Sequence, residues 1–364
     1  MRQTVVRIAL DAMGGDHAPL APVAGAVAAA RAWGYEIQLV GRESEVRAAL
    51  QQQRDLTAVQ HLLRIVDAPE VIEMGDHPAT AVRAKRHSSM ATGIELVKKR
   101  DAEAFVSAGN TGGVLASALL GLRRIEGITS DRPALVAQVP TLTGSCVLLD
   151  IGANVDAKPE WLAQFALMGS LYAEVMLGRQ RPSVATLSNG EEQGKGNTAL
   201  MEAIPLIRAL PIHYVGNMEG TDVTAGAADV VVVDGFAGNI FLKGAEGVVA
   251  TMTDMIRQEL TRNPLRAALA LGLRPAFRSI RRRLSYEEVG GVPLLGVNGV
   301  CIVAHGRSTP YAIQNAIRAG AECVERRLIE RIRERLVTLG PYGLSSRGPK
   351  APLNPVESAP EPAV

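Results

Sequence analysis

Aromatic residues make up only 4% of this 364-residue chain, whereas 47% of its residues are hydrophobic. Ala, Val, Leu and Ile must therefore fill the core, which is typical of strands covered by helices on both faces. The scarcity of aromatics thus favours an α/β protein over a β-sandwich. A chain of this length can bury one large core or two modest ones.

The chain also has only three cysteines, a small net charge and no long apolar run. Cys146, Cys301 and Cys323 are odd in number and lack CxxC spacing, so we expect buried thiols in a reducing compartment. The formal net charge of +2 gives no reason to expect nucleic-acid binding. No signal pattern precedes the first expected strand and no apolar run approaches the ~18 residues that span a bilayer, so we expect a cytoplasmic protein.

The usual signatures of metal and covalent catalysis are also missing. The six histidines show neither HExxH nor HxxxH spacing, so we expect no metal and no cofactor. There is no GxSxG elbow and no Cys in a polar glycine-rich loop, hence no obvious covalent nucleophile. Only His305, at the end of an expected strand, occupies a position typical of an active-site residue, and a structural role is the alternative.

Short apolar runs that end in Gly, Asn or Asp predict about ten buried strands. These runs cover residues 7–14, 36–41, 63–70, 104–110, 134–140, 145–154, 183–190, 212–220, 230–236 and 300–306. Helical stretches between them include residues 20–33, 113–124, 159–177, 198–210 and 240–262. This alternation implies βαβ units and therefore an α/β fold with a largely parallel sheet.

The domain organisation follows from the same patterns. We expect a single α/β catalytic domain over residues 1–339, with a basic amphipathic helical insertion at 262–285. Pro, Gly and Ser dominate residues 340–364 and large apolar residues are few, so this segment is expected to be a disordered tail.

The strand ends are the places to search for a ligand. In an open parallel sheet, ligands bind at the carboxyl ends of the strands, where helix N-termini present free N–H groups. Gly and Asn at these ends let a ligand approach the backbone and offer a neutral amide donor. Any one such loop is an ordinary turn, but their repetition predicts an anion site. The loops contain Gly109-Asn110-Thr111, Ala153-Asn154, Asn189-Gly190, Gly216-Asn217, Gly238-Asn239 and Asn298-Gly299.

The loop SNGEEQGKGNT, residues 188–198, is the most informative because Lys195 lies between two glycines just ahead of an expected helix. A cation at this position can bind phosphate. The alternative is that Lys195 is a solvated loop lysine. The loop fails the Walker P-loop spacing, and Gly196 replaces the Ser or Thr that would hold magnesium. Residues 194–199 fit GxGxxA, with Glu219 further on, so a nicotinamide enzyme stays an alternative although the motif does not follow its strand directly.

Two acidic residues flank the first glycine turn, DAMGGDHAP. Asp11 and Asp16 could bind a cation, but capping of the next helix is the more ordinary role.

Several longer motifs occur in a fixed order along the chain. They are DAMGGDHAP, EVIEM, Arg83, Lys85 and Arg86 ahead of Ser88-Ser89-Met90, SAGNTGG, DIGAN, LSNGEE with KGN, and DGFAGN. Together they resemble the PlsX type of phosphate acyltransferase over residues 6–335. The resemblance implies a three-layer αβα fold similar to isocitrate and isopropylmalate dehydrogenases and to phosphotransacetylases, in a homodimer. Arg307 departs from the pattern, because many relatives have a small residue there.

The resemblance also implies a reaction, in which long-chain acyl-[acyl carrier protein] and inorganic phosphate give acyl phosphate and free carrier protein. The product would feed phosphatidic acid and phospholipid synthesis through a membrane glycerol-3-phosphate acyltransferase. Two residues carry over as catalytic. Lys195 of KGN would neutralise phosphate, and Asn239 of DGFAGN would stabilise the oxyanion on the thioester carbonyl. The expected substrate and phosphate contacts are Asn110, Thr111, Gly112, Asn154, Asn189, Gly196, Asn197, Gly238 and His305.

Residues 262–285 carry seven arginines and no acidic residue, and they predict two short basic helices interrupted by Gly272 and Pro275. Apolar side chains recur beside the arginines at helical spacing, which is a basic amphipathic pattern. Three uses stay open: docking of the acidic carrier protein, peripheral contact with the inner face of the membrane, which the resemblance also implies, or packing in the homodimer. The contact residues would be Arg274, Phe277, Arg278, Arg281, Arg282 and Arg283.

A non-catalytic lipid-interaction protein that uses this basic segment is a further alternative. The dense set of Gly and Asn loops between Asn110 and Asn239 argues against it.

Overall fold

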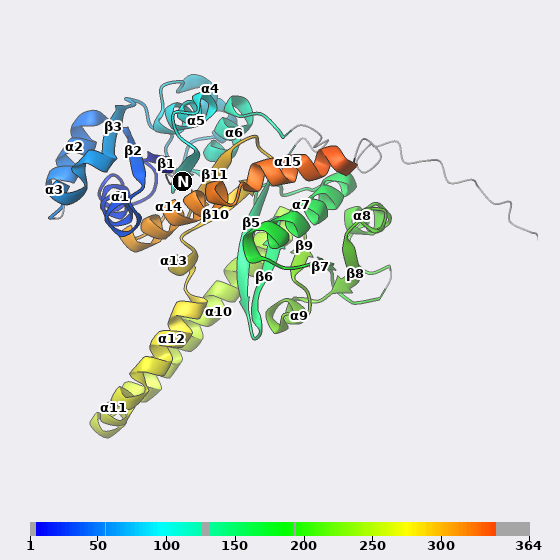
Figure 1. Cartoon of the computed structure of the whole chain (residues 1–364). Helices are drawn as coiled ribbons and strands as arrows, with labels where there is room; N and C mark the ends of the chain where they lie inside the picture. Colours follow the sequence, from blue (N-terminus) through cyan, green and yellow to red (C-terminus); the bar gives the residue numbers. More distant parts are fainter. Residues whose placement is uncertain (1–4, 55, 126–131, 193, 340–364) are drawn as a thin grey trace, which may run out of the picture.

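A computed structural model describes residues 5–54, 56–125, 132–192 and 194–339 (Figure 1). The segment 340–364, expected to be a disordered tail, lies outside this described part. Eleven strands of the described chain form one sheet, in the order β3-β2-β1-β4-β11-β10-β5-β6-β9-β7-β8. Their bounds are β1 (Arg7–Asp11), β2 (Glu36–Gly41), β3 (Leu63–Asp67), β4 (Ala104–Ser107), β5 (Ala134–Thr141), β6 (Gly144–Leu149), β7 (Ser183–Leu187), β8 (His213–Met218), β9 (Val230–Val232), β10 (Gly291–Leu295) and β11 (Val300–Ala304).

The sheet consists of two parallel groups that run in opposite directions. Strands β3, β2, β1, β4 and β11 are parallel to one another, as are β6, β9, β7 and β8. Between them, β10 is antiparallel to both of its neighbours, and β5 is antiparallel to β6. The largely parallel sheet is thus confirmed. However, the carboxyl ends of the two groups emerge at opposite edges of the sheet, so the candidate loops do not share one edge.

Strand β10 was missed by the sequence patterns. It contains Pro293 and begins at the second glycine of the Gly290-Gly291 pair, and both features disfavour a strand. Pairing with strands on both sides overrides these local preferences, with Val292 opposite Val303 and Leu294 opposite Leu135.

Fifteen helices lie in the described residues. Those near the sheet are α1 (Leu20–Trp33), α2 (Glu43–Gln51), α3 (Leu56–Val59), α4 (Pro78–Ala84), α5 (Ser89–Lys99), α6 (Thr111–Gly121), α7 (Pro159–Leu177), α8 (Thr198–Arg208), α9 (Gly220–Ala225), α13 (Tyr286–Val289), α14 (Pro310–Glu325) and α15 (Leu328–Leu339), with a short 3₁₀ turn at Gln60–Leu62. The other three are α10 (Gly235–Thr261), α11 (Pro264–Ala270) and α12 (Arg274–Leu284).

Helices pack on both faces of the sheet, so the predicted three-layer αβα arrangement is confirmed. On β1, Ile8 belongs to a hydrophobic cluster that includes side chains of α1, α7 and α14, whereas Ala9 belongs to a second cluster with side chains of α5 and α6. Alternate residues of one strand therefore face different helical layers. Cys146, Cys301 and Cys323 are all free and buried, as expected, and burial raises the pKa of each thiol to about 12.

The basic insertion forms two short helices, as the sequence predicts. Helix α11 and helix α12 are separated by a 3₁₀ turn at Leu271–Leu273. Together with the long helix α10 they form an arm that projects away from the sheet (Figure 1). In the described residues, no helix combines the length and the low charge needed to cross a membrane.

Candidate active site

The lysine loop connects β7 to α8. Gly194 and Gly196 on either side of Lys195 have φ values of +97° and +114°, which side chains other than glycine rarely adopt. Asn189 Oδ1 accepts a hydrogen bond from the backbone N–H of Gly196 at 3.0 Å and so closes the loop. The Lys195 side chain is exposed, and in the part of the chain that the structure describes its ammonium forms no ion pair.

A second strand end supports this loop from the side. Asn217, at the end of β8, donates its amide to the backbone oxygens of Glu192 at 3.2 Å and Lys195 at 3.4 Å. Its own Oδ1 accepts from Thr186 Oγ1 at 2.8 Å. The main chain at Lys195 is therefore fixed by the neighbouring strand, while the charged end of the side chain stays available.

Helix α10 begins earlier than the sequence patterns predict. Gly238 and Asn239 were expected in a loop before a helix at 240, but they lie in the first turns of α10. The helix starts at Gly235 because Asp234 is a good N-cap, whose Oδ1 accepts from the Ala237 N–H at 2.8 Å. The half-buried side chain of Asn239 is thus placed by a helix, which positions it more precisely than a loop would.

The loop after β6, Asp150 to Asn154, packs against this helix start. A Cβ on Gly238 would lie 1.9 Å from the backbone oxygen of Asp150, and a Cβ on Gly152 would lie 3.8 Å from the Asn239 amide nitrogen. The Asp150 carboxylate accepts hydrogen bonds from the N–H groups of Leu135, Gly152, Ala153 and Asn154 and from the Asn154 amide. Burial raises the pKa of this carboxyl, and the hydrogen bonds oppose the rise.

Asn154 is 5% exposed, and its amide nitrogen donates to Pro133 O and Asp150 Oδ2, both at 2.8 Å. Its Oδ1 has no hydrogen-bond partner in the described structure. The Asn154 side chain therefore shapes the loop below Asn239.

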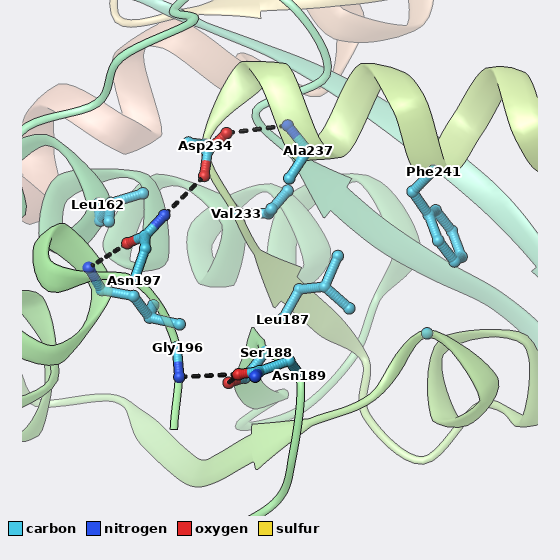
Figure 2. A pocket seen from close by; sticks show the side chains of 12 residues that line it. Leu162, Leu187, Ser188, Asn189, Gly196, Asn197, Val233, Asp234, Ala237 and Phe241 are labelled. Carbon is cyan, nitrogen blue, oxygen red and sulfur yellow. Dashed lines mark hydrogen bonds between the residues drawn. The ribbon is translucent and has the colours of Figure 1, made fainter. Parts of the chain in front are cut away.

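A cavity of about 550 Å³ lies between the lysine loop and the start of α10 (Figure 2). It is lined by Leu162, Leu187, Ser188, Asn189, Gly196, Asn197, Leu200, Gly220, Val233, Asp234, Ala237 and Phe241. Ser188, Asn189, Asn197 and Asp234 contribute polar groups to its lining, and most of the other lining side chains are aliphatic or aromatic. The predicted residues Asn189, Gly196 and Asn197 are thus brought together, with Lys195 next to them in sequence.

The Asn197 side chain connects two helix starts at this cavity. Its Oδ1 accepts from the Leu200 N–H at 2.8 Å, which caps α8, and its amide nitrogen donates to Asp234 Oδ2 at 3.4 Å (Figure 2).

Asn110, Thr111 and Gly112 lie in the other half of the sheet, after β4. Thr111 and Gly112 are the first residues of α6, which begins two residues earlier than predicted. Asn110 is its N-cap, with Oδ1 accepting from Gly113 N at 3.0 Å. The Asn110 amide nitrogen donates to the backbone oxygens of Glu73, Met74 and Asp76. Its polar atoms therefore hold the 73–76 loop, and Thr111 is exposed beside it.

The expected capping role of Asp11 is wrong, because α1 has no side-chain cap. Asp11 is 1% exposed, its Oδ2 accepts from Ser107 Oγ at 2.7 Å and its Oδ1 accepts from Met13 N at 3.1 Å. Ser107 Oγ in turn accepts from Gly109 N at 3.0 Å. Asp11 thus joins the first glycine turn to the loop after β4, whereas α1 has no side-chain cap.

His305 lies after β11, in the same half of the sheet as Asn110. Its ring is exposed and its Nδ1 accepts from the Arg307 N–H at 3.2 Å. The pair Asn298-Gly299 lies in the hairpin turn from β10 to β11, so it follows the carboxyl end of β10, the strand that the sequence patterns missed.

The sequence patterns did not single out Asp150 and Asp234 at the site, whereas Asn217 belongs to the expected pair Gly216-Asn217. A signal for the two acids is present, since Asp150 opens DIGAN and Asp234 opens DGFAGN, but a search for Gly and Asn at strand ends passes over them. Glu219, which could have been the acid of a dinucleotide fingerprint, is the N-cap of α9 and shares a capping box with Asp222.

Comparisons with known proteins agree with the resemblance. The family described as "Fatty acid synthesis protein" matches residues 6–331. A curated relative from Desulfitobacterium hafniense (strain DSM 10664 / DCB-2), named phosphate acyltransferase, is 48% identical over 91% of this chain and 98% of its own length. A relative of the same name from Heliobacterium modesticaldum is 47% identical over 91% of this chain and 98% of its own. The nicotinamide alternative gains no support from these names.

Solved structures support the fold independently. A phosphotransacetylase from Streptococcus pyogenes aligns with a TM-score of 0.56 at 19% identity, over 88% of this chain and 94% of its own. The EutD phosphotransacetylase from Staphylococcus aureus gives a TM-score of 0.55 at 16% identity, over 87% and 94%. These identities establish the fold alone. The extent and identity of the sequence matches show that the chain belongs to the phosphate acyltransferase family, whose curated members are named as enzymes.

Proposed function

We propose that this enzyme transfers a long-chain acyl group from acyl carrier protein to inorganic phosphate, with Lys195 and Asn239 as its catalytic residues. The observation that carries the proposal is the placement of Lys195. Its exposed side chain belongs to a loop held by Asn189 and Asn217 just before the N-terminus of α8, and its neighbour Gly196 lines the cavity. A cation and a helix N-terminus together are a favourable environment for a polyanion.

The chemistry needs a site for phosphate and a donor for the thioester oxygen. A phosphate oxygen attacks the carbonyl carbon, the C–S bond breaks, and the carrier leaves as a thiolate that takes a proton from solvent. An ordinary thiol has a pKa near ~8.5, so its departure needs little acid catalysis. Lys195 lowers the repulsion within the phosphate, and Asn239 donates its amide N–H to the developing oxyanion.

The apolar part of the cavity supports an acylated substrate. Leu162, Leu187, Leu200, Val233 and Phe241 line the cavity next to the polar wall. An acyl chain that enters here would place its thioester near the starts of α8 and α10. The second set of predicted contacts, Asn110, Thr111, Gly112 and His305, would contact the carrier or its prosthetic arm from the other half of the sheet.

The projecting arm supports a peripheral membrane contact and a homodimer as parts of the same proposal. Val248, Met252 and Met255 on α10 are 60%, 56% and 61% exposed. The side chains of Arg274, Phe277, Arg278, Arg281, Arg282 and Arg283 on α12 are exposed. We infer that a second copy covers part of α10, and that α12 contacts anionic lipid at the inner face of the membrane. The enzyme could then pass its lipophilic product to a membrane glycerol-3-phosphate acyltransferase for phospholipid synthesis.

The direct test supplies the protein with long-chain acyl carrier protein and phosphate and traps the product with hydroxylamine. Formation of hydroxamate together with one free carrier thiol for each product, both dependent on phosphate, is expected. Release of the thiol without phosphate dependence would identify a thioesterase instead and refute the proposal.

A further inference from the structure

We propose that Asp234 is a positioning residue that holds the Lys195 loop and the Asn239 helix in register through its hydrogen bond to Asn197. This inference rests on the proposed roles of Lys195 and Asn239. Asp234 stands five residues before Asn239, and Asn197 stands two residues after Lys195. One side-chain bond thus connects the two elements that carry the catalytic groups.

The bond is directional because both of its partners are also helix caps. Asp234 uses Oδ1 to accept the Ala237 N–H at 2.8 Å and Oδ2 to accept the Asn197 amide at 3.4 Å. Asn197 uses Oδ1 to accept the Leu200 N–H at 2.8 Å, which fixes its amide nitrogen toward Asp234 (Figure 2). Neither side chain can rotate without losing its capping hydrogen bond.

The other attachments of the lysine loop do not reach α10. Asn189 connects Gly196 to the end of β7, and Asn217 connects the loop to the end of β8. Of these three attachments, only Asn197 to Asp234 leads to the helix that carries Asn239. Loss of this bond would leave the loop folded but free to shift relative to Asn239, and a misplacement of about 1 Å can lower a rate roughly 10²-fold.

The geometry also explains why a carboxylate lies in a site proposed for phosphate. Both oxygens of Asp234 accept hydrogen bonds from groups that bear partial positive charge, the start of α10 and the Asn197 amide. Its charge is therefore directed at these donors. The amide of an Asp234→Asn variant would place its N–H donor opposite the N–H donor of Asn197. Two facing donors would push the lysine loop and α10 apart.

An exchange of the two side chains tests the inference. Asp234→Asn and Asn197→Asp each keep a capping oxygen but create a donor–donor or a carboxylate–carboxylate contact, so kcat should fall roughly tenfold to a hundredfold with little change in KM for the carrier. The double variant Asp234→Asn/Asn197→Asp restores a donor facing an acceptor and should recover most of the loss. Asn197→Ser keeps a favoured cap, lacks the amide donor, and should resemble the single variants.

Two further measurements make the result decisive. Asp67→Asn is the matched control, because Asp67 Oδ1 accepts the Glu43 N–H at 3.0 Å at the opposite end of the sheet, and it should leave kcat unchanged.

Hydrogen exchange of the Gly196 and Leu200 amides measures the order of the loop without any turnover. Exchange at Gly196 should accelerate in both single variants and recover in the double variant. If the wild type forms no acyl phosphate, the proposed function is refuted. The exchange pattern would still show whether Asp234 connects the lysine loop to α10. The positioning role would be overturned if the double variant were as impaired as the single variants in both kcat and Gly196 exchange. Single variants with unchanged kcat would overturn it as well.

Discussion

At the scale of single residues, the proposed chemistry depends on Lys195 and Asn239, and their surroundings are mostly structural. The Gly and Asn loops look alike in sequence. The structure separates them, because Asn110 and Asn154 donate their amides to backbone carbonyls or to Asp150, whereas Lys195 keeps its ammonium exposed. Motif order and the family resemblance led to Lys195 and Asn239, whose catalytic roles stay a prediction. Asp150 and Asp234 open two of these motifs, but their hydrogen bonds to distant loops are set by the tertiary structure, so the sequence did not show what they hold.

The first prediction concerns Lys195. Lys195→Ala should lower kcat for acyl-phosphate formation by at least ~10²-fold, because the cation that balances the phosphate is lost. Its stability should not change, since the side chain is exposed and the loop is fixed by main-chain contacts. Lys98→Ala, which removes an exposed lysine on α5, is the control for loss of a positive charge. Turnover of Lys195→Ala at the wild-type rate would rule out a catalytic role for this lysine.

The second prediction concerns Asn239. Asn239→Asp keeps the size of the side chain but replaces its N–H donor with an acceptor, so kcat should fall about 10²- to 10³-fold, the usual cost of one oxyanion donor. The effect should appear in kcat measured at saturating carrier and phosphate. A change confined to KM would indicate that Asn239 binds substrate and does not act on the transition state.

At the scale of elements, the proposed catalytic residues lie in or next to helix starts, and close packing determines where these helices begin. The sequence predicted α1 and α7 with the bounds that the structure has. It placed the starts of α6 and α10 too late, because glycine there suggests a loop although it serves close packing. Gly235 and Gly238 let α10 lie directly on the Asp150 loop, and such a contact between distant segments has no signature in local propensity.

The third prediction uses two glycines of α10. Gly238→Ala should displace the start of the helix and lower both activity and thermal stability, because its Cβ would lie 1.9 Å from a backbone oxygen. Gly244→Ala is the matched control, since nothing lies within 4 Å of its added Cβ. That variant should gain roughly 0.5–1 kcal/mol of stability from the better helix propensity of Ala. Equal melting temperatures for the two variants would contradict the packing described for Gly238.

At the scale of the whole molecule, composition and alternation were sufficient for an α/β fold with a largely parallel sheet. They could not give the reversal between its two halves, which depends on β10. That strand has weak local signals and is defined by its partners β5 and β11. The reversal puts Asn110 and His305 at a different sheet edge from Lys195 and Asn239, so the candidate residues form two separate groups of loops.

The fourth prediction concerns the arm and the membrane. Arg281/Arg282/Arg283→Glu should weaken binding to vesicles that contain anionic lipid. Loss of three cations at about 1 kcal/mol each corresponds to roughly a hundredfold. Activity toward soluble carrier substrate should persist, because α12 projects away from the sheet (Figure 1). Co-sedimentation at several salt concentrations measures the effect, and an equal fraction of bound protein for both forms would exclude a membrane role for these arginines.

The most direct test of the central claim follows the oxygens of phosphate. The enzyme is incubated with long-chain acyl carrier protein and ¹⁸O-labelled phosphate, and the intact acyl phosphate is analysed by mass spectrometry. Attack by phosphate on the thioester predicts a product that retains every labelled oxygen, including the one that bridges carbon and phosphorus, and Lys195→Ala should form almost none of it. Free fatty acid without any labelled acyl phosphate would contradict the account.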